Sequence, residues 1–157
     1  MIKAEDLRIG DLVRVSHNCS IPEGTVCVVT EIYPERTSGD KKGIVRLSYT
    51  DGTDDGPWGV WCSNIEGLPL TPEILENNGW KKKIFYVQLH KSVREWHEYT
   101  LPGTDLNIDY RPYIALDTQK FSINYEYLML KYIKYVHELQ HILWALGLDA
   151  NLKIQTI

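Results

Sequence analysis

The chain has 157 residues, of which 43% are hydrophobic and 24% are charged, and its formal net charge is −4. This length allows one ordinary domain or two very small ones, and the composition excludes long disordered segments. Residues 1–71 carry seven Lys and Arg against eleven Asp and Glu, so the negative charge lies in the first half. Because phosphate neutralisation dominates nucleic-acid affinity, the overall charge does not favour a nucleic-acid partner.

Three cysteines, Cys19, Cys27 and Cys62, show no C-x-x-C spacing, so a disulfide framework is not expected. His17 lies two residues before Cys19, but no further ligand candidates accompany them, and we do not interpret them as a metal site. The first residues, MIKAEDLRIGD, are acidic where a secretory signal would be apolar, and no apolar run approaches the ~18 residues of a membrane span. We therefore expect a cytoplasmic protein.

Residues 1–70 are predicted to form short strands separated by turns. The expected strands are rich in β-branched and aromatic residues, and they are Asp11–Val15, Thr25–Tyr33, Gly43–Tyr49 and Trp58–Ser63. Four or five short strands cannot bury a face as an open sheet, so we expect them to close into a small barrel. Their order resembles an SH3-like β-barrel, a resemblance that speaks to fold and not to function.

A short linking helix is predicted within residues 71–83. Thr71 is a good N-cap, Pro72 is tolerated in a first helical turn, and Gly79 provides a stop. The only basic run of the chain, Lys81–Lys83, follows this helix, and we interpret it as solvated surface.

Residues 84–157 are predicted to form an α+β module. Its expected strands are Ile84–His90, Val93–Leu101, Leu106–Leu116 and Phe121–Tyr127. A helix is predicted over Tyr125–Leu146, because apolar residues recur there at spacings of three and four. That apolar stripe needs a sheet to cover, so we expect an antiparallel four-stranded sheet packed on one face by a long C-terminal helix.

The stretch HELQH, from His137 to His141, has the spacing of the H-E-x-x-H zinc motif, in which Glu138 would activate a water. At about 100° per residue, a helical wheel places His137 and His141 on the wet face among lysines. A third ligand is missing, because Trp144 and Gly147 stand where the extended pattern needs Gly and His. A zinc-dependent hydrolase is therefore a minor alternative, and we expect no cofactor.

Three stretches of the chain resemble an uncharacterised family common in gut Bacteroidetes and their prophages. They are MIKAEDLRIGDLV, NIEGLPLTPEIL and IKYVHELQHILWALGLDANLKI. Members of this family end in a helix that reads like Y-V-H-Q-L-Q-N, and Val136, His137, Leu139 and Gln140 match it. Glu138 and His141 depart from it. The resemblance implies that the H-E-x-x-H pattern arose in a helix that needs no metal, and it implies no catalytic residue.

Four aromatic residues of the expected barrel, Tyr33, Tyr49, Trp58 and Trp61, would suit a groove for peptides or cations, although core packing is the role we favour. No nucleotide-binding motif and no nucleophile with a spaced base is present. We expect a non-enzymatic interaction or adaptor protein, phage- or mobile-element-derived, with a protein partner and no membrane partner. Nucleic-acid binding through the barrel is the second hypothesis.

Overall fold

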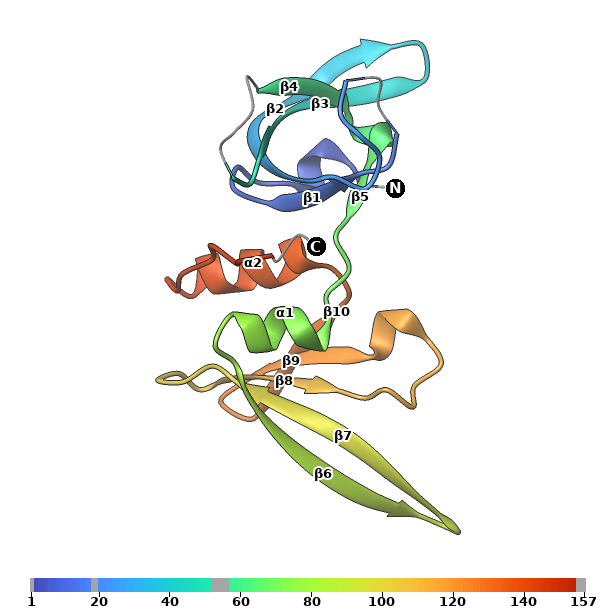
Figure 1. Cartoon of the computed structure of the whole chain (residues 1–157), viewed down its shortest axis with the longest axis vertical. Coiled ribbons are helices and arrows are strands. Elements are labelled where there is room, and N and C mark those ends of the chain that lie inside the picture. The colour runs from blue at the N-terminus through green and yellow to red at the C-terminus, as the bar shows by residue number, and fades with distance from the viewer. Residues whose placement is uncertain (1, 18–19, 52–56, 155–157) are drawn as a thin grey trace. The chain divides into compact units, whose positions relative to one another are not determined.

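The computed structural model describes residues 2–17, 20–51 and 57–154, and the chain forms two compact units. Unit 1 comprises Met1–Leu68 and Tyr135–Asn151, and unit 2 comprises Pro69–Lys134 and Leu152–Ile157. Each unit is built on one five-stranded antiparallel sheet (Figure 1). We predicted a division into residues 1–70, 71–83 and 84–157. In the structure, Tyr135–Asn151 groups with unit 1 instead of with the rest of residues 84–157. No helix of the described residues is long and apolar enough to cross a membrane.

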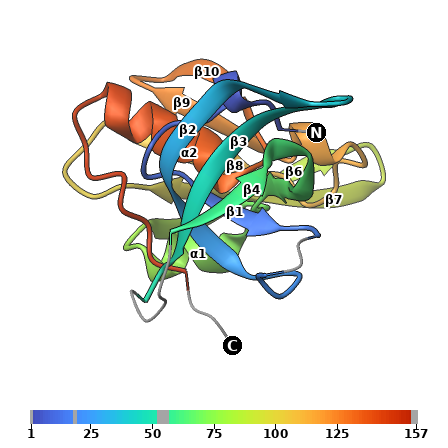
Figure 2. The ribbon, with the colours of Figure 1, turned by 90° about the horizontal axis from the view of Figure 1, so that it is seen from above.

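The sheet of unit 1 has the strand order β4-β3-β2-β1-β5. Its strands are β1 (Leu12–Val15), β2 (Val26–Ser38), β3 (Lys41–Tyr49), β4 (Trp58–Trp61) and β5 (Ile65–Gly67). Figure 2 shows β2, β3 and β4 side by side, as their pairing requires. Alternate side chains such as Val13, Val45 and Leu47 are fully buried and form the core of this unit.

The predicted closed SH3-like barrel is wrong. β4 and β5 are the two edges of an open sheet, and no pairing between them is found in the described residues. These strands have only four and three residues, and the 3-10 helix Cys62–Asn64 joins them, so few backbone groups are available to close the sheet. The core is completed instead by the N-terminal turn η1 (Ala4–Asp6), whose Ala4 is buried in it.

The long C-terminal helix predicted over Tyr125–Leu146 is also wrong. Its first half contains strand β10 (Leu128–Ile133), and helix α2 spans only Val136–Ala145. Glu126 and Tyr127 have positive φ angles of 49° and 67°, so they form a two-residue turn that folds β10 back on the preceding strand. β10 is apolar at most of its positions, and periodicity alone cannot assign such a short apolar run to a helix or a strand.

Helix α2 belongs to unit 1, where it contacts β1. The predicted module of a four-stranded sheet packed by this helix is therefore wrong. The chain enters α2 through Tyr135, whose ring lies against β5 so closely that a Cβ atom on Gly67 would be 2.4 Å from it. Only glycine fits at this crossing.

The sheet of unit 2 is a meander with the strand order β10-β9-β8-β7-β6. Its strands are β6 (Lys81–Leu89), β7 (Ser92–Thr100), β8 (Leu106–Tyr110), β9 (Phe121–Tyr125) and β10. The buried residues Tyr99, Ile108 and Ile123 are direct partners across β7, β8 and β9, so one face of the sheet forms the core of this unit.

Helix α1 (Pro72–Asn77) packs on that buried face and confirms the predicted start signal (Figure 1). The hydroxyl of Thr71 accepts a hydrogen bond from the backbone N–H of Ile74 at 3.3 Å. Glu76 faces the sheet, because its Oε1 atom lies 3.4 Å from the Tyr99 hydroxyl and 3.6 Å from Lys82 Nζ. The basic run Lys81–Lys83, which we placed in the linking segment 71–83, lies in β6.

Candidate functional site

Glu138, the catalytic residue of the zinc-hydrolase alternative, caps helix α2. Its Oε1 atom accepts a hydrogen bond from the backbone N–H of Tyr135 at 3.0 Å, which is the reciprocal half of a capping box. A carboxylate in this position satisfies a backbone donor that would otherwise lack a partner at the helix start. The geometry therefore gives Glu138 a role in holding the helix end.

His137 is buried, with 6% of its surface exposed, so its predicted place on the wet face is wrong. Its ring stacks on Tyr135 at 5.6 Å and meets His141 edge-on at 5.7 Å. Burial lowers the pKa of His137 below its ordinary value, because the charged ring would lose its hydration; the carboxylate of Asp11 acts in the opposite direction. Its Nδ1 atom has no hydrogen-bond partner within the described part of the chain.

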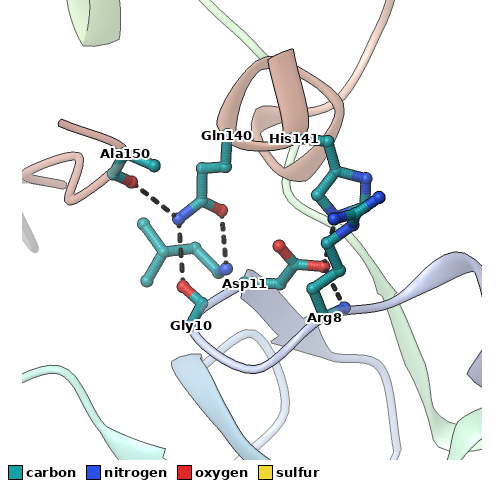
Figure 3. Close-up of polar contacts among 7 residues, drawn as sticks. Arg8, Gly10, Asp11, Gln140, His141 and Ala150 are labelled. Atoms are coloured by element: carbon teal, nitrogen blue, oxygen red, sulfur yellow. Dashed lines mark hydrogen bonds and ion pairs between the residues drawn. The ribbon is translucent and has the colours of Figure 1, made fainter. Parts of the chain in front are cut away.

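His141 pairs with a buried carboxylate at the start of β1. Its Nε2 atom lies 2.7 Å from Asp11 Oδ2 (Figure 3). The same oxygen accepts a hydrogen bond from the backbone N–H of Arg8 at 2.8 Å, and Asp11 is only 2% exposed. The pair links a residue of α2 to one that lies 130 positions earlier in the chain.

Gln140 connects α2 to two other segments of unit 1 (Figure 3). Its Oε1 atom accepts from the backbone N–H of Leu12 at 2.8 Å, and its Nε2 atom donates to the carbonyls of Gly10 at 3.0 Å and Ala150 at 3.1 Å. We call Asp11, Gln140 and His141 the polar clamp. Buried polar groups are stable when they are hydrogen-bonded, so the clamp holds the helix against β1.

The zinc-hydrolase residues do not assemble into a metal centre in the residues that the structure describes. No group of three or more His, Cys, Asp or Glu in residues 2–17, 20–51 and 57–154 is arranged to hold a metal ion. His141 is engaged by Asp11, and Glu138 is engaged by the helix start. Cys27 and Cys62 are buried and form no disulfide within the described residues, and Cys19 lies outside them.

The four aromatic residues proposed as an interaction surface lie on two opposite faces of the sheet. Tyr49 and Trp58 pack against the core, where Trp58 is the direct partner of buried Leu47. Tyr33 and Trp61 flank Ile44 on the outer face. Successive strand residues point to opposite faces, and the strand register decides which residues share one. The four side chains therefore do not line one groove.

The outer pair is already engaged with neighbouring side chains. The Tyr33 hydroxyl donates to Glu31, and this hydrogen bond raises the pKa of Tyr33 because ionisation would remove the donated proton. Arg36 lies 5.8 Å from the Tyr33 ring, and Lys41 Nζ lies 6.0 Å from the Trp61 ring. These cation–aromatic contacts are typical of a structured protein surface.

Unit 2 contains a feature that the sequence did not reveal. Strands β6 and β7 pair along their full nine residues, but only His97–Thr100 of β7 also pair with β8. Phe85–Leu89 and Ser92–Trp96 therefore form a two-stranded ribbon, which Figure 1 shows extending away from β8 and β9. We call Phe85–Trp96 the ribbon.

The ribbon exposes apolar side chains. Tyr86 is 69% exposed and Val93 is 59% exposed. On the other face, the rings of Phe85 and Trp96 stack at 5.0 Å with an angle of 14° between them. An isolated two-stranded hairpin is marginally stable in water, so such a ribbon gains stability when something covers it.

Positive charge is concentrated on the strands that carry the ribbon. Residues 81–100 contain five Lys and Arg against two Asp and Glu, a net charge of +3, whereas the rest of the chain carries −7. Lys83 Nζ lies 4.9 Å from the Phe85 ring, and the guanidinium carbon of Arg94 lies 5.7 Å from the Tyr113 ring. The basic run was visible in the sequence, but the pairing of its strand with β7 was not.

A polar hollow of about 370 Å³ lies on the solvent face of the same sheet. It is lined by Glu98, Thr100, Thr104, Asp105, Leu106, Asn107, Asp109, Asn124, Glu126 and Tyr127. Asp109 Oδ2 accepts from Asn124 Nδ2 at 3.1 Å and lies 3.4 Å from a guanidinium nitrogen of Arg111. Four carboxylates make this hollow acidic, in contrast to the neighbouring ribbon.

Comparison with known proteins gives no match. No family model matches the chain, and no curated protein and no solved structure is significantly similar to it. The geometry of the two units is therefore the basis for a functional proposal.

Proposed function

We propose that this protein is a non-enzymatic interaction protein and that the ribbon Phe85–Trp96 is its contact surface. The observation that carries the proposal is the exposure of Tyr86 and Val93. They lie in the part of β6 and β7, from Phe85 to Trp96, where the described strands pair only with each other. Burying such apolar side chains is favourable at about 25 cal/mol per Å², so a partner gains affinity there. Aromatic residues are also enriched at protein interfaces.

The arrangement of HELQH supports the same proposal. A histidine–carboxylate pair can serve as a general base, but His141 and Asp11 lie in a clamp that holds α2 to β1. Glu138 caps the helix, and His137 is buried beneath Tyr135 and His141. These contacts give Glu138, Gln140 and His141 structural roles, which supports a binding protein.

The wider setting belongs to the proposal as well. We propose that the protein acts in the cytoplasm, where cysteines such as the buried Cys27 and Cys62 would stay reduced. The three stretches that resemble an uncharacterised family of gut Bacteroidetes and their prophages support a phage- or mobile-element-derived origin. A binding protein without catalytic residues is consistent with that resemblance.

A ribbon-deletion variant tests the proposal. Replacing Phe85–Trp96 by Asn-Gly joins the partner residues Ile84 and His97 through a two-residue hairpin turn. We expect this variant to keep the melting temperature of the wild type and to lose the partners that the wild type captures from cells of its source. Each captured partner is then purified and titrated against both proteins.

An Ile9→Ser variant is the matched control, because Ile9 is an exposed apolar residue of unit 1, 71% exposed. It should bind as the wild type does. Binding of every purified partner to the folded ribbon-deletion variant with wild-type affinity would overturn the proposal.

A further inference from the structure

One face of the ribbon and its base combines flat aromatic surface with positive charge. Lys81, Lys83 and Phe85 alternate along β6 and so share a face, and Trp96 and Arg94 share it from β7. We call these five residues the aromatic face. Phe85 and Trp96 are half-buried, and the three cationic side chains are exposed.

The aromatic rings form a platform rather than an edge-to-face pair. The angle of 14° between Phe85 and Trp96 makes their rings nearly parallel, and they stack with their centroids 5.0 Å apart. Lys83 Nζ lies over the Phe85 ring, 4.9 Å from its centroid, so Trp96 is the ring of the pair that we consider for stacking on a ligand. Stacking surfaces next to a line of cations are the arrangement by which proteins bind unpaired bases and the phosphates between them.

The charge distribution favours the same ligand. The strands that carry the ribbon have a net charge of +3 within a chain of −4, so an anion is attracted to this element and repelled by the rest of the chain. An acidic peptide would also meet the cations, but it brings no flat rings to the platform. A duplex keeps its bases stacked inside, so the platform would gain nothing from it.

The acidic hollow limits where such a ligand lies. Glu98 is the direct cross-strand partner of Lys83, and Asp109 is the next residue across the sheet. Their carboxylates repel phosphates, so the ligand must run along the edge strand β6, from Lys81 toward the tip of the ribbon, and not across β7 into the hollow.

We propose that the aromatic face binds single-stranded nucleic acid, with Trp96 stacking on a base and Lys81, Lys83 and Arg94 contacting phosphates. This inference goes beyond the proposed function, because it assigns a ligand to the face of the ribbon opposite Tyr86 and Val93. It replaces the earlier hypothesis of nucleic-acid binding through a barrel, because the barrel does not form.

Fluorescence anisotropy with labelled single-stranded DNA and RNA of about 20 nucleotides tests the inference on the full chain. We expect binding that weakens about 20-fold between about 50 and about 200 mM salt, because roughly three phosphates are neutralised on a single strand. A duplex of the same length should bind more weakly.

Matched substitutions on the two faces of β6 and β7 locate the site. Lys83→Gln should weaken binding several-fold and reduce the salt dependence, whereas Lys82→Gln on the opposite face should not. Trp96→Ala should weaken it about fivefold or more, and Tyr86→Ala should not. Glu98→Gln should tighten binding, because a carboxylate beside Lys83 is removed. Melting curves show that each variant is folded.

The possible outcomes separate the inference from the proposed function. Absence of binding at low salt, or equal losses from Lys82→Gln and Lys83→Gln, overturns the inference. Equal affinity for duplex and single strand also overturns it. If purified acidic protein binds the ribbon and nucleic acid does not, the inference fails while the proposed function stands. If neither class of partner depends on the ribbon, both fail.

Discussion

The polar clamp of unit 1 and the ribbon of unit 2 place polar and apolar residues in opposite ways. Unit 1 buries Asp11 and Gln140, which are 2% and 4% exposed, and satisfies them with hydrogen bonds. Unit 2 leaves Tyr86 and Val93 in solvent, 69% and 59% exposed. A buried polar group costs free energy unless it is paired, so the polar residues of unit 1 determine how α2 is held. Exposed apolar residues gain nothing from the fold itself, and those of the ribbon are the basis of the proposed contact surface.

A pair of valine substitutions should show the largest contrast between the units. Val45 is fully buried in β3 and Val93 is exposed in β7. Val45→Ser should lower the free energy of unfolding by about 3 kcal/mol, because it removes buried methyl groups and buries a hydroxyl. Val93→Ser should change it by less than about 0.5 kcal/mol. Urea unfolding of both variants checks this, and equal losses would mean that the ribbon is packed in solution.

A pair of glutamine substitutions tests the polar clamp. Gln140→Ala should cost about 2 kcal/mol, because it leaves the Leu12 N–H and the carbonyls of Gly10 and Ala150 without this partner. Gln88→Ala is the control, because Gln88 is exposed and only donates to the carbonyl of His90 at 3.1 Å.

Hydrogen exchange of the Leu12 amide should accelerate in the Gln140 variant and stay unchanged in the Gln88 variant. A Leu12 amide that remains equally protected in both would show that the clamp does not hold α2.

The smallest expected effect concerns the pH dependence of unit 1. Burial lowers the pKa of His137 in the folded chain, whereas the unfolded chain keeps the ordinary value of 6.5. As the pH falls below that value, the unfolded state binds a proton that the folded state resists, so stability decreases. The loss should reach up to about 1 kcal/mol per pH unit, until the pH approaches the folded pKa.

His137→Phe tests this assignment, because it keeps a ring against Tyr135 and removes the titration. The stability of this variant should fall less than that of the wild type between about pH 7 and about pH 5. Asp11, His141, Glu138 and Asp6 also surround the site and remain in both proteins. Parallel stability curves for the two proteins would contradict the role of His137.

Local signals in the sequence were sufficient for most of the secondary structure. The strands predicted near residues 11–15, 43–49 and 121–127 are present, because alternating apolar residues and turn residues act over a few positions. The start of α1 was predictable for the same reason, since Thr71 caps a donor only three residues away. These features depend on neighbours in the chain, and the sequence alone determined them.

Tertiary structure decided what lies between segments that are far apart in the chain. Strand register placed Tyr49 and Trp58 in the core and Tyr33 and Trp61 outside, because a shift of one residue exchanges the faces of a strand. The turn before β10 converted half of a predicted helix into a strand.

The site residues show the same division. HELQH was visible as a motif in the sequence. Its structural role depends on the contact of His141 with Asp11, which lies 130 positions earlier in the chain. The ribbon likewise exists because β6 and β7 pair with each other over more residues than β7 pairs with β8. Short-range propensities favour helices and strands, whereas burial, register and pairing depend on contacts between distant segments, which no local pattern contains.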